Sequence, residues 1–151
     1  MPLLAEKIVT LKLGSPLFVA SGSSMRQVIE TIQQAQAGSV LILDGKRLVG
    51  IMTERDVLMK VVARHVDYDK PIDEFMTPNP RTLRPADTIG DALNLMHEAG
   101  LRNIPIVDEE GVVIAVFRAR DVIHHLAESF PAHVLNLPPR PNQKMKTAEG
   151  A

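Results

Sequence analysis

One short segment of this chain occurs twice, and this repetition limits the folds that the chain can adopt. Residues 50–57 read GIMTERDV, and residues 115–122 read AVFRARDV. From Phe18 and Thr82 onward the two halves align at an offset of 64 residues, which becomes 65 before the repeated segment, and apolar positions pair nearly throughout. A chain of 151 residues that contains one unit twice is predicted to be a pseudo-symmetric pair. Because each half alone would bury little apolar surface, we expect the halves to share a core.

The apolar periodicity predicts the same order of elements in each half. A hydroxyl residue, Ser24 or Thr88, precedes an i, i+3, i+4, i+7 stripe that is typical of a helix with one buried face. Two short apolar runs joined by a tight turn follow, which we interpret as strands, and a second helix begins near Glu54 or Ala119. With a short leading strand, each half is predicted to be a β-α-β-β-α unit, and the fold class is α/β (α+β).

Proline clusters mark the expected boundaries between the parts of the chain. We expect an N-terminal segment (1–14), a first repeat (15–66), a linker (67–77), a second repeat (78–130) and an irregular Pro-rich tail (131–151).

Composition excludes several classes of function. A net charge of −1 and a pI near 6.5 argue against binding to a nucleic acid backbone, and the absence of cysteine excludes disulfides and thiolate chemistry. The N-terminus lacks the pattern of a signal peptide, and no run of 18 apolar residues occurs, so we expect a cytoplasmic protein without a membrane span. Phosphate-loop, metal and nucleophile spacings are also missing around Gly38, His124 and Ser23, and we predict that the protein is not an enzyme.

The first copy of the repeated segment carries a hydroxyl and an acid at the predicted start of a helix. At Thr53 and Asp56, free backbone N–H groups and the positive end of the helix dipole would face a ligand. A carboxylate there can accept hydrogen bonds from both hydroxyls of a ribose, and the threonine hydroxyl can bind a ribose or phosphate oxygen. The same residues also fit an imperfect capping box, which needs no ligand.

The second copy keeps the acid as Asp121 but has Arg118 in place of the hydroxyl residue. Arg118 either fills the second pocket or supplies a fork for phosphate oxygens. Asp121 is explained either by ligand binding or by a charge that favours a helix N-terminus. We therefore predict that the complete motif of the first repeat is the stronger site.

Several stretches together resemble a known family. The doubled β-α-β-β-α unit, residues 75–78 (FMTP), residues 102–108 (RNIPIVD) and the Gly-apolar-apolar-Thr-x-x-Asp closure resemble a tandem cystathionine-β-synthase (CBS) domain pair, over residues 15–129. The resemblance implies a regulatory module without a catalytic cofactor. It also implies an adenosine ligand, such as AMP, ADP, ATP or S-adenosylmethionine, in a cleft between the repeats, and a homodimer formed through the second helices.

The resemblance also implies which residues line the cleft. Arg102 occupies a position from which this family reaches ligand phosphates, although an exposed loop arginine explains it equally. Apolar side chains near the motifs could sandwich an adenine, although most of them belong to the core first. Together with the two closing motifs, the residues expected at the cleft are Gly38, Ser39, Val40, Ile51, Arg102, Asn103, Ile104 and Val116.

Two hypotheses of different classes follow. In the first, the protein senses an adenosine ligand and signals to a regulated partner whose identity the sequence does not give. In the second, it is a ligand-free scaffold that keeps the fold for assembly. The complete Thr53 and Asp56 motif favours the sensor, and Arg118 favours the scaffold.

Overall fold

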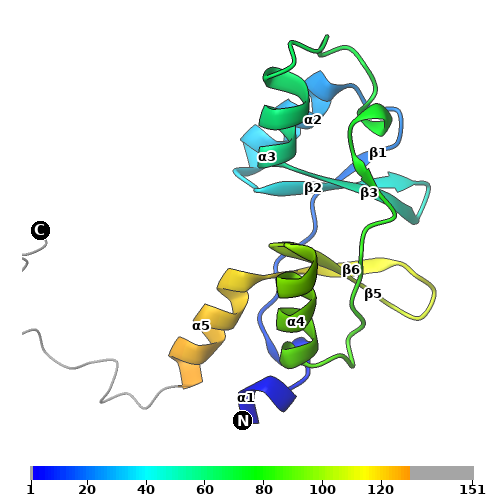
Figure 1. The fold of residues 1–151 in the computed structure, drawn as a ribbon. Coiled ribbons are helices and arrows are strands. Elements are labelled where there is room, and N and C mark those ends of the chain that lie inside the picture. Colours follow the sequence, from blue (N-terminus) through cyan, green and yellow to red (C-terminus); the bar gives the residue numbers. More distant parts are fainter. Residues whose placement is uncertain (1, 130–151) are drawn as a thin grey trace, which may run out of the picture.

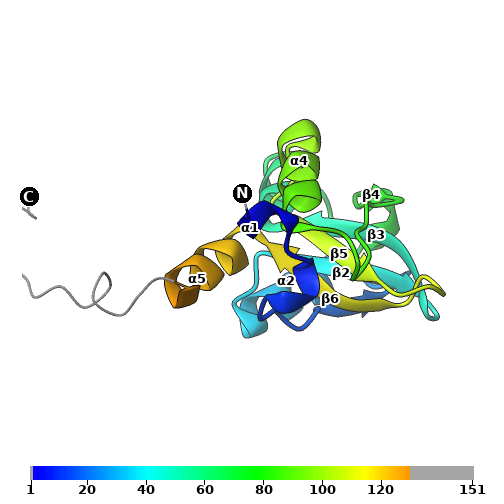
Figure 2. The same ribbon diagram turned by 90° about the horizontal axis from the view of Figure 1, so that it is seen from below.

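The computed structural model describes residues 2–129, which form two sheets stacked face to face between two layers of helices (Figure 1). The first half contains β1 (Phe18–Ala20), α2 (Met25–Ala35), β2 (Ser39–Asp44), β3 (Arg47–Thr53), α3 (Glu54–Asp56) and η2 (Val57–Val62). The second half contains α4 (Ile89–Ala99), β5 (Asn103–Val107), β6 (Val113–Arg118) and α5 (Ala119–Ser129). The connecting segments contain α1 (Pro2–Ala5), η1 (Ile8–Thr10), η3 (Ile72–Glu74) and β4 (Thr77–Pro78). Figure 2 shows α1 beside α4 of the second half.

The two sheets have the same topology. In the first sheet the order is β1-β2-β3-β4, with β1 parallel to β2 and the other neighbours antiparallel. In the second sheet β5 pairs with β6, and isolated bridges from Leu83 to Ile106 and from Gly14 to Val116 take the places of β1 and β4. The predicted α+β class and the doubled β-α-β-β-α unit are therefore confirmed.

Capping side chains start the first helix of each repeat, as the sequence predicts. The Ser24 hydroxyl accepts a hydrogen bond from the Gln27 N–H at 3.2 Å, and the Thr88 hydroxyl accepts one from the Asp91 N–H at 3.1 Å. In each case the third residue of the helix returns a bond to the cap N–H, which satisfies two otherwise free donors. The second helix of the first repeat is less regular than predicted. After one α-helical turn it continues as the π-helix η2, in which the Ala63 N–H bonds to the Leu58 carbonyl at 2.8 Å.

Two short segments, which we call the straps, hold the repeats together. Residues 6–11 precede the first repeat in sequence but pack on the second, and residues 70–75 precede the second repeat but pack on the first. Ile8 and Ile72 lie at equivalent positions in the straps, and both are completely buried. The Ile89 N–H bonds to the Glu6 carbonyl, as the Met25 N–H bonds to the Lys70 carbonyl. The N-terminal segment and the linker are thus structural equivalents, a symmetry that our alignment from Phe18 onward missed.

A third apolar cluster joins the two sheets. Its buried members come from both repeats: Leu41, Ile51, Val107, Val113 and Val116. Together with the exchanged straps, this cluster makes the two repeats one module. Within residues 2–129, no helix has the length and the apolar character that crossing a bilayer requires.

Candidate functional site

A cavity of about 560 Å³ lies between the repeats, where β2, β5 and α5 begin. Its residues come from the loop before β1, from residues 35–39 after α2, and from the two ends of the β5–β6 hairpin. The described lining contains three arginines and no carboxylate; it consists of Ser15, Pro16, Leu17, Ala35, Gln36, Ala37, Gly38, Ser39, Leu41, Arg102, Asn103, Val116, Arg118, Ala119 and Arg120. A cavity with this lining favours an anion.

The structure brings six of the predicted site residues to this cavity and places six elsewhere. The residues on its lining are Gly38, Ser39, Arg102, Asn103, Val116 and Arg118. Val40 and Ile104 are completely buried in the cores of their repeats, and Ile51 belongs to the cluster between the sheets. Thr53, Asp56 and Asp121 do not line the cavity either, because local hydrogen bonds hold them at their helix starts.

Thr53 and Asp56 form a closed capping box. The Thr53 hydroxyl accepts a hydrogen bond from the Asp56 N–H at 3.1 Å, and the Asp56 carboxylate accepts one from the Thr53 N–H at 3.0 Å. The other carboxylate oxygen lies 3.7 Å from the Lys60 ammonium. The structure therefore gives both residues the capping role that needs no ligand.

Arg118 and Asp121 form an ion pair in the second repeat. The Asp121 carboxylate accepts hydrogen bonds from the Arg118 N–H at 3.0 Å, from Nε at 3.3 Å and from Nη2 at 3.0 Å. The Asp121 side chain is only 4% exposed, whereas that of Arg118 is 28% exposed. In this conformation the buried carboxylate of Asp121 is hydrogen-bonded to Arg118, and part of the guanidinium stays exposed on the lining of the cavity.

Gly14 packs closely against the guanidinium of Arg118. Its carbonyl accepts a hydrogen bond from the Val116 N–H at 3.3 Å. A Cβ added at residue 14 would lie 2.5 to 2.9 Å from three guanidinium atoms of Arg118, which is too close for any side chain. The chain that leads from the first strap therefore packs directly against the arginine.

A second, outer cavity of about 300 Å³ was not predicted from the sequence, and neither was a place for Arg120 on the site. Arg118 and Arg120 line both cavities, so the two adjoin at these residues. The other residues of the outer cavity are Lys12, Asp121, His124, His125 and Glu128. The signal that could have found Arg120 is the alternation Arg-Ala-Arg in the second motif, because Arg118 ends β6 and Arg120 is the second residue of α5.

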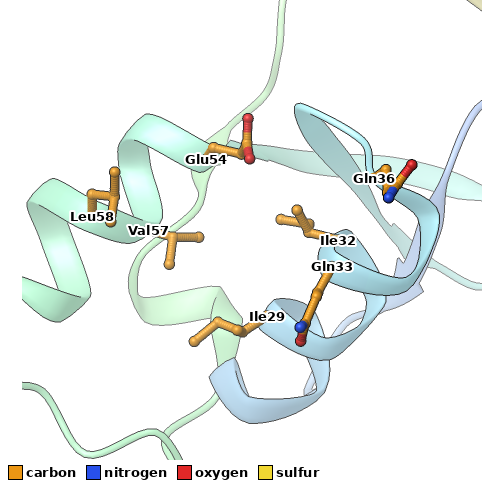
Figure 3. A pocket seen from close by; sticks show the side chains of 7 residues that line it. All are labelled: Ile29, Ile32, Gln33, Gln36, Glu54, Val57 and Leu58. Atoms are coloured by element: carbon orange, nitrogen blue, oxygen red, sulfur yellow. The ribbon is translucent and has the colours of Figure 1, made fainter.

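An apolar groove of about 660 Å³ lies on the first repeat between α2 and the helix formed by α3 and η2. Figure 3 shows Val57 pointing across the groove toward Ile29 and Ile32 of α2, with Leu58 farther out on the same helix as Val57. Leu58 and its neighbour in sequence, Met59, are each 57% exposed. Val61, in contrast, is completely buried, so the predicted apolar face divides into a core side and a surface side.

Comparison with known proteins identifies the repeats. The family model of the CBS domain matches residues 9–63 and again residues 72–128. The CBS domain-containing protein CBSCBSPB2 of Arabidopsis thaliana is 30% identical over 119 residues, which cover 78% of this chain and 21% of that protein. The chain thus spans about a fifth of the length of this relative.

Solved structures share the fold. A CBS domain protein of Pyrobaculum aerophilum, complexed with AMP, has a TM-score of 0.72 and 23% identity, and the match covers 82% of this chain and 99% of that one. The CBS domain pair of protein MJ0100, in complex with methylthioadenosine and S-adenosyl-L-methionine, has a TM-score of 0.74 and 20% identity, with coverage of 83% and 99%.

Proposed function

Because this chain belongs to the CBS domain family, we propose that it is a regulatory module that binds an adenine nucleotide in the cavity between its repeats. The observation that carries this proposal is the cavity lining, which combines three arginines, no carboxylate and the glycine-containing turn before β2. A positively charged cavity of about 560 Å³ is large enough for a mononucleotide, since typical small-molecule sites have volumes of about 300 to 1,000 Å³.

The charge of the lining favours a phosphorylated ligand over S-adenosylmethionine. The two solved relatives bind AMP in one case and methylthioadenosine with S-adenosyl-L-methionine in the other. The paired N–H donors of a guanidinium match the oxygens of a phosphate in geometry and charge. The sulfonium cation of S-adenosylmethionine, in contrast, would be repelled by the positive charge of the arginines. Within residues 2–129, neither Arg102 nor Arg120 has an ion-pair partner, so both guanidinium groups are available to an anion.

In this arrangement the two repeats contribute different parts. Arg102 and Arg118 bind phosphate oxygens, and the backbone at Gly38 and Ser39 packs against the nucleoside. A ribose contact to Asp56 stays a prediction, because it requires the capping box to open or to share its carboxylate.

A ligand panel tests the proposal. Thermal shift with adenosine, AMP, ADP, ATP and S-adenosylmethionine should show stabilisation by the nucleotides, which at 100 times the dissociation constant amounts to about 2.7 kcal/mol. The chain has one Tyr and no Trp, so nucleotide retained through purification should also dominate the absorbance at 260 nm. If none of the nucleotides binds at millimolar concentration, the ligand-free scaffold becomes the better hypothesis.

We also propose that the protein forms a homodimer through the apolar groove on the first repeat. Ile29, Val57 and Leu58 line this groove, and Leu58 and the next residue, Met59, are exposed. Exposed apolar side chains at a groove are typical of surfaces that bind another protein. Leu58→Glu should convert a particle of about twice 16.6 kDa into a monomer in light scattering, since it puts an unpaired charge into the contact. The matched control is Ile114→Glu, a change at a similarly exposed residue of β6, which should leave the dimer intact. A wild-type chain that stays monomeric at tens of micromolar contradicts the proposal.

A further inference from the structure

We propose that the preferred ligand carries more than one phosphate, and that its phosphate chain passes Arg118 and Arg120 into the outer cavity. The inference rests on the proposed function, because it extends a nucleotide whose nucleoside lies between the repeats. It assigns the outer cavity as a subsite for the terminal phosphates of an adenosine di- or triphosphate.

The two cavities are adjacent. Arg118 and Arg120 line both, so an anion at these arginines in the larger cavity already lies at the mouth of the smaller one. The outer cavity has a volume of about 300 Å³. Beyond the arginines it offers the ammonium of Lys12 and the imidazole of His124.

Arg118 has N–H donors that Asp121 does not use. A guanidinium has five N–H donors, and Asp121 takes only two of them, from Nε and from Nη2. Within the described part of the chain, no other hydrogen bond uses the remaining three. Asp121 is therefore a positioning residue, because it fixes the plane of the guanidinium and leaves the opposite edge for phosphate oxygens.

Positively charged side chains outnumber carboxylates on the linings of the two cavities. Four cationic side chains, Arg102, Arg118, Arg120 and Lys12, line the two cavities, against the carboxylates of Asp121 and Glu128. Lys12 lies 3.6 Å from Glu128, but the two side chains are 88% and 56% exposed. Such a surface pair contributes little, so a phosphate can compete for the ammonium. A single phosphate group would neutralise only part of this positive charge, whereas a chain of two or three phosphates would neutralise more of it.

Calorimetric titrations with AMP and ATP, in EDTA, test the inference. ATP should bind the wild-type protein about tenfold more tightly than AMP, because it adds charge-assisted contacts in a partly exposed site. Lys12→Ala should weaken ATP binding by roughly 3- to 10-fold and leave AMP binding within about twofold. Lys70→Ala is the matched control, since Lys70 also forms an exposed pair with a glutamate, at 3.7 Å, and lies on the strap of the first repeat, outside both cavities. The control should change neither affinity.

Inorganic tripolyphosphate separates this inference from the proposed function. If no adenine nucleotide binds, but tripolyphosphate binds with an affinity that Lys12→Ala lowers, the phosphate subsite stands and the proposed function is wrong. If AMP and ATP bind equally well, or if Lys12→Ala weakens both to the same degree, the subsite is wrong and the proposed function stands.

Discussion

The two copies of the closing motif use the same acid for different purposes. In the first repeat, the Asp56 carboxylate caps a helix together with a threonine hydroxyl. In the second repeat, the Asp121 carboxylate still accepts the backbone N–H three residues before it, but its remaining capacity goes to the guanidinium of Arg118. The capping bond is common to both copies, so the fold itself gives a reason to keep an acid at this position.

What differs between the copies is the residue that the acid holds. The Thr53 hydroxyl accepts one hydrogen bond in the cap and offers a ligand a single uncharged O–H donor. An arginine held by its own aspartate keeps three donors, and Arg118 lies on the cavity between the repeats. The altered copy, which the sequence suggested was the weaker site, is therefore the better equipped one for an anion.

The largest expected difference concerns stability. Asp121→Ala leaves a partly buried arginine without its partner, and we expect a loss of about 3 kcal/mol in the free energy of unfolding. Asp56→Ala removes a capping bond and a partly exposed pair with Lys60, with an expected loss of about 1 kcal/mol. Urea denaturation of both variants measures the two losses, and Asp91→Ala, which removes only a cap on α4, is the control. Equal losses for the two motifs would contradict the comparison.

Arg118→Thr tests the difference between the two motifs directly, because it gives the second motif the residue of the first. We expect nucleotide affinity to fall by roughly 10- to 30-fold, since a charge-assisted phosphate contact is lost. The cap on α5 should survive, because threonine can accept from the Asp121 N–H as Thr53 does from the Asp56 N–H. Titration with AMP, with circular dichroism as the control for folding, checks both parts. An affinity that is unchanged or improved would show that Arg118 blocks the cavity rather than binding the ligand.

Thr53→Ala distinguishes the cap from a ribose contact in the first motif. The cap predicts a loss of about 1 kcal/mol in stability of the ligand-free protein, with nucleotide affinity unchanged. A ribose contact predicts a loss of affinity of a similar size. Melting curves without ligand and titrations with adenosine and AMP measure the two effects separately. A loss of affinity without a change in melting temperature would show that Thr53 contacts the ribose of the ligand and that its cap contributes little to stability.

The sequence predicted the fold well because its strongest signals are local. Helix caps such as Ser24 and Thr88, apolar periodicity and the repeated closing segment each act within a few residues of the chain. The exchange of the straps was not predicted, because an isolated buried Ile8 has no periodic context. Only the position of Ile8 64 residues before Ile72, the same offset that relates the two repeats, indicates that Ile8 belongs to an equivalent buried segment.

The candidate site was predicted only in part, and the reason is side-chain direction. The sequence pattern can place Arg118 and Asp121 near the start of a helix. It cannot decide whether the guanidinium points toward the carboxylate of Asp121 or toward a ligand. That choice depends on Gly14, more than one hundred residues earlier in the chain, which leaves room for the arginine only because it has no side chain. Val40 and Ile104 were expected at the cleft for their apolar character, and the same character buries them in the two cores.

The smallest expected difference between the repeats lies at the straps. The Asp73 carboxylate accepts hydrogen bonds from the Ser21 hydroxyl and from the Gly22 N–H, the latter at 2.6 Å, whereas the equivalent residue of the other strap is the exposed Val9. The Ser21 hydroxyl, helped by the Gly22 N–H and opposed by burial, lowers the pKa of Asp73 in the folded protein. The folded state therefore binds fewer protons than the unfolded chain, so this contribution to stability is present above about pH 4 and is lost as the pH falls through the folded pKa.

Asp73→Ala should consequently destabilise the protein at neutral pH by less than about 1 kcal/mol, because the carboxylate is exposed and solvent screens it. The difference from the wild type should shrink between pH 5 and pH 3. Urea denaturation as a function of pH measures it. Glu74→Ala is the control, because that carboxylate lies on the same strap and forms only an exposed pair with Lys70. A difference between the wild type and Asp73→Ala that stays constant down to pH 3 would mean that the ionisation of Asp73 does not stabilise its strap. Both straps would then be held in the same way, by the burial of Ile8 and Ile72 and by backbone hydrogen bonds.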